Sequence, residues 1–277
     1  MKLQASIVTY HTDSAELRKC IGALIAEAVV DRIYVVDNSR CDSTRSLCAA
    51  FGPSVEYIPH DNTGYGDAHN EAIRRSIAAG ADLHLVINSD VYFDKGNLAA
   101  CVRHMAANPG VVQLIPHTTY PDGREQYVIH PLPTPLDMLM RGFLPECMLR
   151  KRRRRYQLRD RDPRAVIDAP YHHGCFMLMR TDALSEAGLF DPRFFMYPED
   201  IDLTRRMHRL GRTIYWPGAD IVHAHRAESK HSGRMRRIHI VNMLRYFRKW
   251  GFFFDSERRR TNKALFKSLS DNTTIKS

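Results

Sequence analysis

The sequence predicts an α/β fold, with a Rossmann-like and mostly parallel sheet flanked by helices. Two observations carry this prediction. Short β-branched runs alternate with helical segments through the first 116 residues, and such alternation requires right-handed crossovers between parallel strands. Polar residues also gather directly after three of these runs, where the carboxyl ends of parallel strands form a ligand-binding edge.

Five short apolar runs are the predicted strands of this first half. Their β-branched residues are typical of strands that are buried on both faces of a parallel sheet. In chain order they are LQASIVTY (3–10), RIYVVD (32–37), VEYIP (55–59), LHLVIN (83–88) and VVQLIP (111–116).

Helices are expected between these strands. Asp13 and Glu16 have capping-box spacing ahead of a helix that continues to about residue 28. Gly80 suits the C-terminal cap of the third helix. The remaining predicted helices cover about 43–51, 67–79 and 95–108, the last of them halted by Pro109.

The second half of the chain has a less regular pattern. Residues 117–168 read as an insertion with one or two helices, and HGCFMLMR (173–180) reads as a buried strand. A short helix, an acidic helix and a final pair of strands within 213–225 follow. The last ten residues, SLSDNTTIKS, are polar and are expected to be flexible.

A basic amphipathic helix is predicted from about Gly233 to Trp250, because apolar residues recur there at helical spacing among arginines. The apolar positions are Met235, Ile238, Val241, Leu244 and Phe247.

Composition narrows the class of protein. The 277 residues suffice for one large domain or two small ones, and a hydrophobic fraction of 44% is ordinary for a chain with a substantial core. No run of 18 apolar residues occurs, and the N-terminus lacks a signal-peptide layout. The six cysteines form no C-x-x-C pair, which argues against a zinc site or a secreted disulfide framework. We therefore expect a cytoplasmic protein.

The net charge of +10 indicates an anionic partner, which could be a nucleic acid, a phosphorylated substrate or a membrane surface. The excess of positive charge is concentrated in the run from Arg150 to Arg155 and in the last fifth of the chain.

Acidic residues follow two of the predicted strands. Asp90 comes just after strand 83–88 and can coordinate Mg²⁺ or Mn²⁺ that bridges a diphosphate, with Asn88 on the same side of the extended chain. Asp37 can accept a hydrogen bond from a pyrimidine ring N–H. The glycine-containing segment 62–70 suits a close approach to phosphate or ribose.

Glu199, Asp200 and Asp202 crowd the start of a helix in the segment Phe194–Gly211. Acidic side chains in a first helical turn complement the helix macrodipole, and this segment taken alone favours that interpretation. The alternative is that one of the three removes a proton from a substrate.

Seven motifs together resemble the family-2 inverting glycosyltransferases, and in particular the bacterial rhamnosyltransferase-like branch, which adds sugars to cell-surface polysaccharides. Within about residues 3–225 they are SIVTYH, VVDNS, NTGYGDAHN, VINSDVYF, GCFMLMR, FDPRFFMYPEDIDLTRRM and IVHAH. The resemblance implies a GT-A fold, a nucleoside-diphosphate sugar donor and a divalent cation, Mg²⁺ or Mn²⁺, held partly by a D-x-D-type motif.

The resemblance also implies roles for the residues that bind the donor and the metal. The nucleobase pocket would be lined by Thr9, Tyr10 and Asp37, and the nucleoside and diphosphate side by Asn62, Gly64 and Asn70. The metal motif consists of Asn88, Ser89 and Asp90, with His223 completing the metal shell and His225 on the same strand face. Asn88 replaces the first acid of the family pattern, so Asp90 must supply most of the metal binding.

The acidic segment matches the family motif whose aspartate is the general base. This implies that Asp200 is the base, that Glu199 orients the acceptor or tunes the base, and that Asp202 is a supporting residue. The base would deprotonate an acceptor hydroxyl as its oxygen attacks the anomeric carbon, and this single displacement inverts the sugar.

The expected organisation is a GT-A domain over 1–232, followed by the basic helix and a flexible tail over 233–277. Within the domain, a donor-binding half covers about 1–116 and an acceptor half about 117–232, with a basic insertion at about 131–165.

The branch resemblance favours rhamnose from a thymidine-diphosphate donor, with a uridine-linked hexose or galactofuranose as the second choice. The acceptor would be a cell-surface polysaccharide or a lipid-linked glycan. The basic segments suggest peripheral attachment to an anionic membrane surface at the inner face of the cell membrane, and no nucleic-acid partner is expected.

Two other functions are alternatives to this one. A nucleotidyltransferase usually has a glycine-rich loop directly after the first strand, and no glycine occurs here before Gly22. A nucleic-acid-binding protein could use the arginine clusters, and steep salt-dependent binding to random duplex would favour it.

Overall fold

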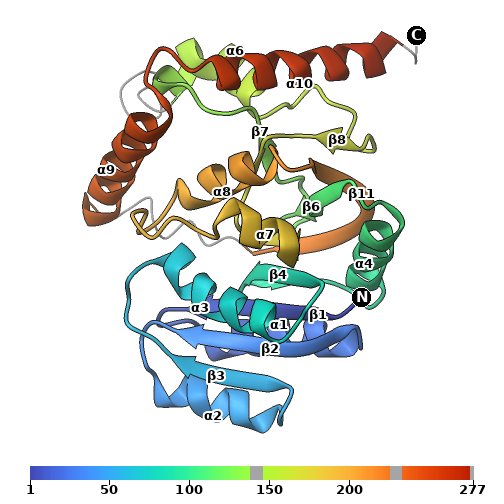
Figure 1. Ribbon diagram of the computed structural model, residues 1–277, viewed down its shortest axis with the longest axis vertical. Coiled ribbons are helices and arrows are strands. Elements are labelled where there is room, and N and C mark those ends of the chain that lie inside the picture. The colour runs from blue at the N-terminus through green and yellow to red at the C-terminus, as the bar shows by residue number, and fades with distance from the viewer. Residues whose placement is uncertain (138–145, 225–232, 275–277) are drawn as a thin grey trace.

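One mixed sheet of nine strands runs through the molecule, and the computed structural model describes residues 1–137, 146–224 and 233–274. The strand order is β3-β2-β1-β4-β10-β6-β11-β5, with β8 pairing with β11. Figure 1 shows the N-terminal strands at one end of the molecule and the C-terminal helix across the other end.

The strands within residues 3–88 form a parallel part of the sheet, as the sequence predicts. They are β1 (Leu3–Thr9), β2 (Val30–Asp37), β3 (Val55–Pro59) and β4 (Leu83–Asn88). The helices of this half are α1 (Ser14–Ala26), α2 (Asp42–Ala50), α3 (Tyr65–Ala78) and α4 (Asn97–Ala107). Asp13 caps α1 through hydrogen bonds from the backbone N–H groups of Ala15 and Glu16.

The second half extends the sheet with strands of both directions. An antiparallel strand, β10 (Phe176–Arg180), lies between β4 and β6 (Val111–Thr119). On the far side of β6 the parallel strand β11 (Arg212–His223) carries β5 (Val91–Tyr92) and β8 (Ile167–Asp168) as antiparallel partners. A separate ribbon pairs β7 (Ile129–His130) with β9 (Tyr171–His172).

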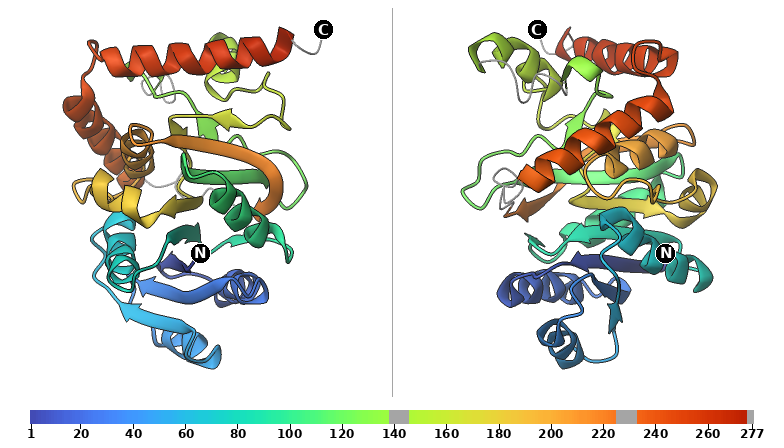
Figure 2. Two further views of the ribbon diagram at one scale, coloured as in Figure 1. Left: turned by 45° about the vertical axis from the view of Figure 1, so that its right-hand side comes forward. Right: turned by 90° about the vertical axis from the view of Figure 1, so that its left-hand side faces the viewer.

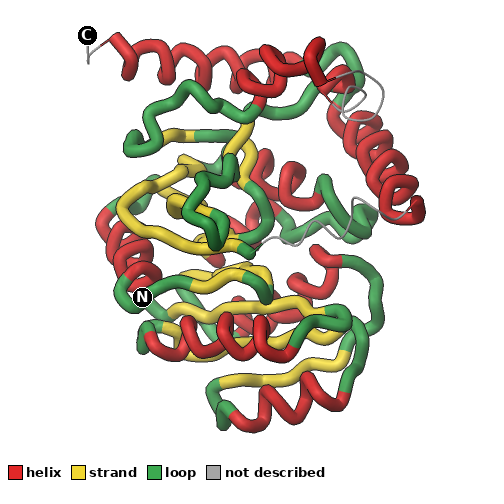
Figure 3. Tube along the Cα trace, turned by 180° about the vertical axis from the view of Figure 1, so that it is seen from behind, coloured by secondary structure: helices red, strands yellow, loops and turns green. Residues whose placement is uncertain are grey.

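The described ranges of this half contain five further helices: α6 (Glu146–Tyr156), α7 (Thr181–Ala187), α8 (Glu199–Met207), α9 (Gly233–Trp250) and α10 (Ser256–Thr274). Figures 2 and 3 show α9 along one side of the molecule and α10 across its end. Within the described residues, no helix combines the length and apolar character that a membrane crossing requires.

Two sequence predictions are wrong in this half. The pair of strands expected within 213–225 is one long strand, whose register with β6 is interrupted between Trp216 and Asp220. The tail expected to be flexible is helical as far as Thr274, because α10 is held by tertiary contacts. Asn262 both donates to and accepts from the backbone of Leu132, and Leu265 is buried.

The apolar face predicted for the basic helix is also wrong in part. Met243, Tyr246 and Phe247 form the buried face of α9, together with Asn242. Val241 and Leu244, which belong to the predicted apolar face, are exposed instead.

Charged side chains attach α9 and α10 to α8. The guanidinium of the buried Arg205 makes paired hydrogen bonds of 2.8 and 2.7 Å to the Asp255 carboxylate and also reaches Glu257. The fully buried Asp202 accepts from the Trp250 indole N–H at 2.8 Å and pairs with Lys249 and Arg206. These contacts are here named the α8 clamp, and they occupy both oxygens of the Asp202 carboxylate within the protein.

Candidate active site

The side chain of Asp200 lies at the N-terminus of α8, buried against the loop that precedes β10. Its Oδ2 accepts the backbone N–H of Gly174 at 3.0 Å, and its Oδ1 accepts that of Ile201 at 2.7 Å. Burial raises the pKa of Asp200 to about 7, against the effect of these two hydrogen bonds. A carboxylate with this pKa is suited to accept a proton at neutral pH.

Glu199 is buried beside Asp200. Burial first, and repulsion from Asp200 second, raises the pKa of Glu199 well above its ordinary value. Its Oε2 atom has no hydrogen-bond partner among the described residues. A protonated Glu199 can therefore donate a hydrogen bond to a substrate oxygen.

The arginines of α8 do not face these two carboxyls. Arg205 engages Asp255 and Glu257, and Arg206 engages Asp202. Neither arginine shifts the pKa of Asp200, so burial is the main reason why that pKa is raised.

One side chain, Tyr65, connects the predicted metal motif to the loop that binds Asp200. The Tyr65 hydroxyl lies 2.8 Å from both Oδ1 of Asn88 and the carbonyl oxygen of Gly174. Gly174 thus binds Tyr65 through its carbonyl and Asp200 through its N–H. Tyr65 is the first residue of α3, and its side chain connects the segment that contains Asp90 to the residue that binds Asp200.

Asp90 and His223 come together from the ends of β4 and β11. The Nε2 atom of His223 lies 3.4 Å from Oδ1 of Asp90 and 3.4 Å from Nδ2 of Asn88. Gln126 orients the imidazole, because its Oε1 lies 2.9 Å from Nδ1 of His223. Burial by itself lowers the pKa of His223, but contact with Cys175 and Asp90 outweighs burial and raises it to about 10.

The fit of this pair to a divalent cation follows from its chemistry. No three His, Cys, Asp or Glu side chains of the described ranges are arranged to enclose an ion. Mg²⁺ and its analogues are commonly bound by one or two protein ligands together with substrate phosphates. The Asp90 carboxylate and the His223 imidazole, once the imidazole has lost its second proton, are two side chains of this kind. His225 lies outside the described residues.

Asp37 occupies the end of β2 but does not face a ligand. Its side chain is fully buried and accepts five hydrogen bonds from within the protein. The donors are Thr9 Oγ1, the N–H and hydroxyl of Ser39, the N–H of Cys41 and the Tyr57 hydroxyl. Burial alone would raise the pKa of Asp37, but these hydrogen bonds lower it below its ordinary value. The carboxylate thus fixes the floor of the proposed nucleobase pocket.

The other predicted donor-side residues fall into two groups. Tyr10 and Asn62 are exposed, and Asn88 and Ser89 are half-buried, so these four can meet a ligand. Asn70 is buried and both ends of its amide bind the Phe190 backbone, at 2.8 and 2.9 Å. It therefore shapes the site only through the loop before α8.

Gly64 is required by a close backbone approach. Its φ is +128°, and a Cβ atom at this position would lie 2.6 Å from the carbonyl oxygen of Phe195. The next residue, Tyr65, donates its backbone N–H to that same carbonyl at 3.0 Å. The start of α3 is thus pressed against the loop that leads to Asp200.

Four site residues were not identified from the sequence: Tyr65, Gln126, Gly174 and Cys175. Three of them, Tyr65, Gly174 and Cys175, belong to the motifs NTGYGDAHN, HGCFMLMR and GCFMLMR. The motifs therefore included these positions, but the sequence assigned them no function. Gln126 lies in the irregular segment, where no pattern indicates contact with His223.

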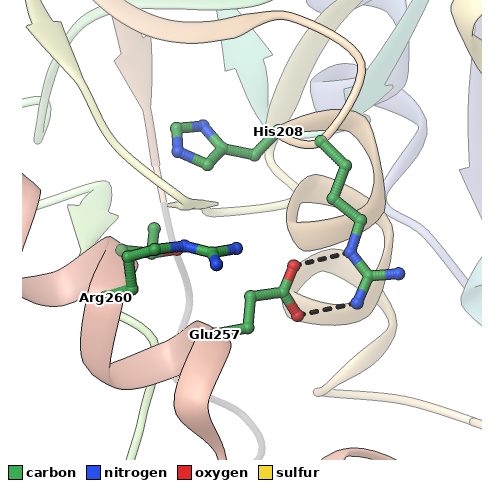
Figure 4. Close-up of a pocket in the computed structure, with 5 residues that line it drawn as sticks. His208, Glu257 and Arg260 are labelled. Atoms are coloured by element: carbon green, nitrogen blue, oxygen red, sulfur yellow. Dashed lines mark hydrogen bonds and ion pairs between the residues drawn. The ribbon is translucent and has the colours of Figure 1, made fainter.

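A cavity lies at the C-terminal end of α8, away from Asp200. This cavity of about 620 Å³ is lined by His208, Arg209, Glu257, Arg260 and Thr261. Figure 4 shows Glu257 bound to Arg209 through two contacts, with His208 and Arg260 beside them. It belongs to the α8 clamp and is separate from Asp200.

Curated proteins similar to this chain include two rhamnosyltransferases. An N-acetylglucosaminyl-diphospho-decaprenol L-rhamnosyltransferase from Mycobacterium tuberculosis is 29% identical over 227 residues, which cover 76% of this chain and 70% of that protein. Rhamnosyltransferase WbbL from Escherichia coli (strain K12) is 23% identical over 246 residues, covering 87% of this chain and 90% of that protein.

A solved structure of GalNAc-T7 with UDP, GalNAc and Mn²⁺ has a TM-score of 0.60 to this chain at 12% identity. The match covers 80% of this chain, which spans less than half of that one, at 44%. It shows the fold, which is the GT-A fold predicted from the sequence. The model of glycosyl transferase family 2 matches residues 6–188, about two thirds of the chain. The chain therefore belongs to glycosyl transferase family 2.

Proposed function

We propose that this protein transfers a sugar, rhamnose in the first instance, from a nucleoside-diphosphate donor to a glycan acceptor with inversion. One observation carries the proposal: the buried Asp200 carboxyl, whose pKa is raised to about 7, is joined through Gly174, Tyr65 and Asn88 to the Asp90–His223 pair. A displacement at an anomeric carbon needs a base for the acceptor hydroxyl and a cation-binding group for the departing diphosphate, and this connected group would supply both.

Asp200 acts as the general base in this proposal. In a productive complex its free lone pairs take the proton of the acceptor hydroxyl, while the N–H groups of Gly174 and Ile201 hold the carboxylate in place. Burial and the neighbouring Asp200 raise the pKa of Glu199, which favours a carboxyl that donates a hydrogen bond to orient the acceptor. A single displacement at the anomeric carbon gives inversion.

Asp90 and His223 are the residues that would hold a divalent cation, Mg²⁺ or Mn²⁺. When bound, the cation neutralises the charge that gathers on the departing nucleoside diphosphate. Asn88 contributes position rather than charge, because its Oδ1 already accepts from Tyr65. The Mn²⁺ present in the solved GalNAc-T7 complex supports this assignment.

The proposal for the acceptor rests on the name of a relative. The Mycobacterium tuberculosis relative is named for a rhamnosyl transfer to a decaprenol-linked N-acetylglucosaminyl diphosphate. We propose that this chain likewise uses a lipid-linked acceptor, in the growth of a cell-surface polysaccharide, at the inner face of the cell membrane. A thymidine- or uridine-linked donor is proposed.

A thermal-shift panel tests the donor. Thymidine- and uridine-diphosphate sugars, with guanosine-diphosphate mannose as the purine control, are added with and without Mn²⁺. A native-state ligand at 100 times its dissociation constant adds about 2.7 kcal/mol of stability. We expect the largest shift from thymidine-diphosphate rhamnose with Mn²⁺. Equal shifts from the purine donor, or none from any, would contradict the pocket assignment.

Product analysis tests the reaction itself. The donor that stabilises the protein is incubated with a soluble acceptor analogue, and the anomeric configuration of the product is read by NMR. An inverted product supports the proposal, and a retained configuration or the release of a nucleotidyl product rejects it.

A further inference from the structure

The outward face of α9 combines exposed apolar side chains with cations. Ile240, Val241 and Leu244 are 44%, 38% and 52% exposed. Arg237 and Arg248, also exposed, lie on the same side of the helix, at the i, i+3, i+4, i+7 and i+11 spacing that these five positions make. The opposite side, with Met243, Tyr246 and Phe247, packs on the protein.

The loop after α9 adds two more apolar side chains. Phe253 is 72% exposed and Phe254 is 90% exposed, in the connection to α10 at an outer corner of the molecule (Figures 1 and 2). Ten large hydrophobic side chains are exposed in the part of the chain that the structure describes, and half of them fall within residues 240–254. This concentration is far from the scattered exposure that is normal for a soluble surface.

The charge of this segment has one sign. Residues 233–254 contain six cations, Arg234, Arg236, Arg237, Arg245, Arg248 and Lys249, and no Asp or Glu. Arg245 and Lys249 are used inside the protein, by Arg193 and by Asp191 and Asp202. For Arg237 and Arg248 no partner is found among the described residues.

We infer that the outward face of α9 and the Phe253–Phe254 loop together form a docking surface for an anionic lipid bilayer. Aliphatic and aromatic side chains can enter the boundary between headgroups and acyl chains, while the flanking arginines meet lipid phosphates. A second copy of the chain fits this face poorly, since self-association would bring arginines against arginines. Nucleic acid would leave Ile240, Val241 and Leu244 without apolar contact.

The surface differs from the one that charge alone suggests. The run Arg150–Arg155 is the most basic segment, but three of its members are engaged within the protein. Arg152 pairs with Asp137, Arg154 pairs with Asp160, and the Arg155 guanidinium lies 4.3 Å from the centre of the Phe266 ring. The α9 surface, in contrast, couples its cations to exposed apolar side chains.

The position of α9 connects the bilayer to the base. Asn242 donates to the carbonyl of Met196 at 3.1 Å, and the ring of His239 lies 4.8 Å from that of Tyr197. These two contacts hold the loop that leads directly into Glu199 and Asp200. A helix with its side chains is about 10–12 Å across, so docking through the outward face of α9 would place this loop about one helix diameter from the bilayer surface. The loop that leads to the base would then lie near the headgroup diphosphate of a lipid-linked acceptor.

This last point rests on the proposed function, whereas docking does not, and the experiment separates them. Flotation with phosphatidylglycerol-containing vesicles is measured for the full chain at low and high salt, with pure phosphatidylcholine vesicles as reference. Transfer is measured on a soluble acceptor and on a lipid-linked acceptor in the same vesicles.

Three paired variants probe the surface: I240S/L244S, F253S/F254S and R237Q/R248Q. Matched controls are I25S/V166S and R74Q/R103Q, which change exposed residues on other elements. We expect each of the three to bind the anionic vesicles at least about tenfold more weakly, with normal thermal stability and normal transfer to the soluble acceptor. Transfer to the lipid-linked acceptor should fall in parallel, and both controls should behave as wild type.

Wild-type vesicle binding in the I240S/L244S and F253S/F254S variants would overturn the inference. So would a change from dimer to monomer in these variants without lipid, which would identify a second copy as the occupant. If the wild type binds the anionic vesicles but transfers sugar to neither acceptor, the proposed function is rejected and the docking surface is not.

Discussion

The hydroxyl of Tyr65 lies 2.8 Å from Oδ1 of Asn88 and 2.8 Å from the carbonyl oxygen of Gly174. One phenol therefore contacts the metal motif on one side and, on the other, the residue whose N–H binds Asp200. The two centres of the proposed reaction are held in register through a side chain that takes part in neither step.

Tyr65→Phe tests this link. The substitution keeps the ring packing against His69, whose centroid lies 4.5 Å away, and removes only the hydroxyl. We expect turnover to fall by about tenfold, as for a lost buried hydrogen bond, with the KM for the donor changed less than kcat. Steady-state kinetics with Mn²⁺ check this. The control is Tyr57→Phe, which removes a hydroxyl that binds Asp37 instead. An equal fall in turnover in this variant would show that the loss is not specific to Tyr65.

Asp200→Asn keeps the shape of the proposed base and removes its basicity. Donor binding should survive while transfer falls by a factor on the order of 10² to 10⁴. Glu199→Gln should lose less, because an amide can still donate a hydrogen bond. Transfer rate and donor affinity are measured together for both variants on one acceptor. Near-normal turnover in Asp200→Asn would move the base to another carboxyl, and lost donor binding would reassign Asp200 to the nucleotide side.

The rate should depend on pH through the same carboxyl. With the pKa of Asp200 at about 7, the base is protonated in acid and ionised in alkali. We expect kcat/KM to rise with pH and to level off above about 7, the value for the free enzyme. A profile that is flat between pH 6 and 8, taken here as about one unit either side of that pKa, would contradict the assignment.

Stability should show the opposite dependence. The pKa of Asp200 is raised on folding, so its protonated form favours the native state below the unfolded pKa of about 4. That contribution is lost as pH rises through about 7. Asp200→Asn should therefore melt at least a few degrees above wild type at pH 8, and at about the same temperature at pH 4, as determined by calorimetry. Equal melting temperatures at pH 8 would show that the charged carboxyl costs nothing in the native state.

Asp37 should behave as a structural carboxylate. Its lowered pKa means that its contribution to stability is present above the unfolded pKa of about 4 and is lost as pH falls through the folded value. Asp37→Ala leaves five donors, one buried and four partly buried, without their acceptor and should cost about 2 kcal/mol or more in the free energy of unfolding. Denaturant titration measures this. A stable variant with weakened nucleotide binding would instead restore Asp37 as a direct ligand of the base.

Much of the fold follows from local pattern. The strands at 55–59 and 83–88 have the predicted bounds, and α1 begins directly after the predicted cap at Asp13. The antiparallel insertion of β10 between β4 and β6 was not predictable, because strand order depends on contacts between residues far apart in the chain. Likewise two strands were predicted within 213–225, whereas one strand continues through this segment with a shift in register between Trp216 and Asp220.

The candidate site divides in the same way. The family resemblance singled out Asp200 and Glu199, which lie at the start of α8, and Asp90 and His223, whose side chains lie 3.4 Å apart. Asp37 and Asn70 also stood in the right places, but their burial and their protein partners make them scaffold residues. Partner choice depends on which backbone groups need acceptors after packing, and a sequence pattern does not contain that information.

The α8 clamp has a consequence during synthesis. Chains fold from the N-terminus as they leave the ribosome, so the parallel strands and their helices can close before Lys249, Trp250 and Asp255 exist. Until those residues arrive, Asp202 keeps Arg206 but lacks Lys249 and Trp250, and Arg205 lacks Asp255 and Glu257. We expect a nascent or truncated chain ending before Lys249 to hold α8 only through its contacts with the sheet, among them the hydrogen bond between Gln113 and Thr204. The order of translation thereby delays the final positioning of the proposed base until residues 249–257 have been made.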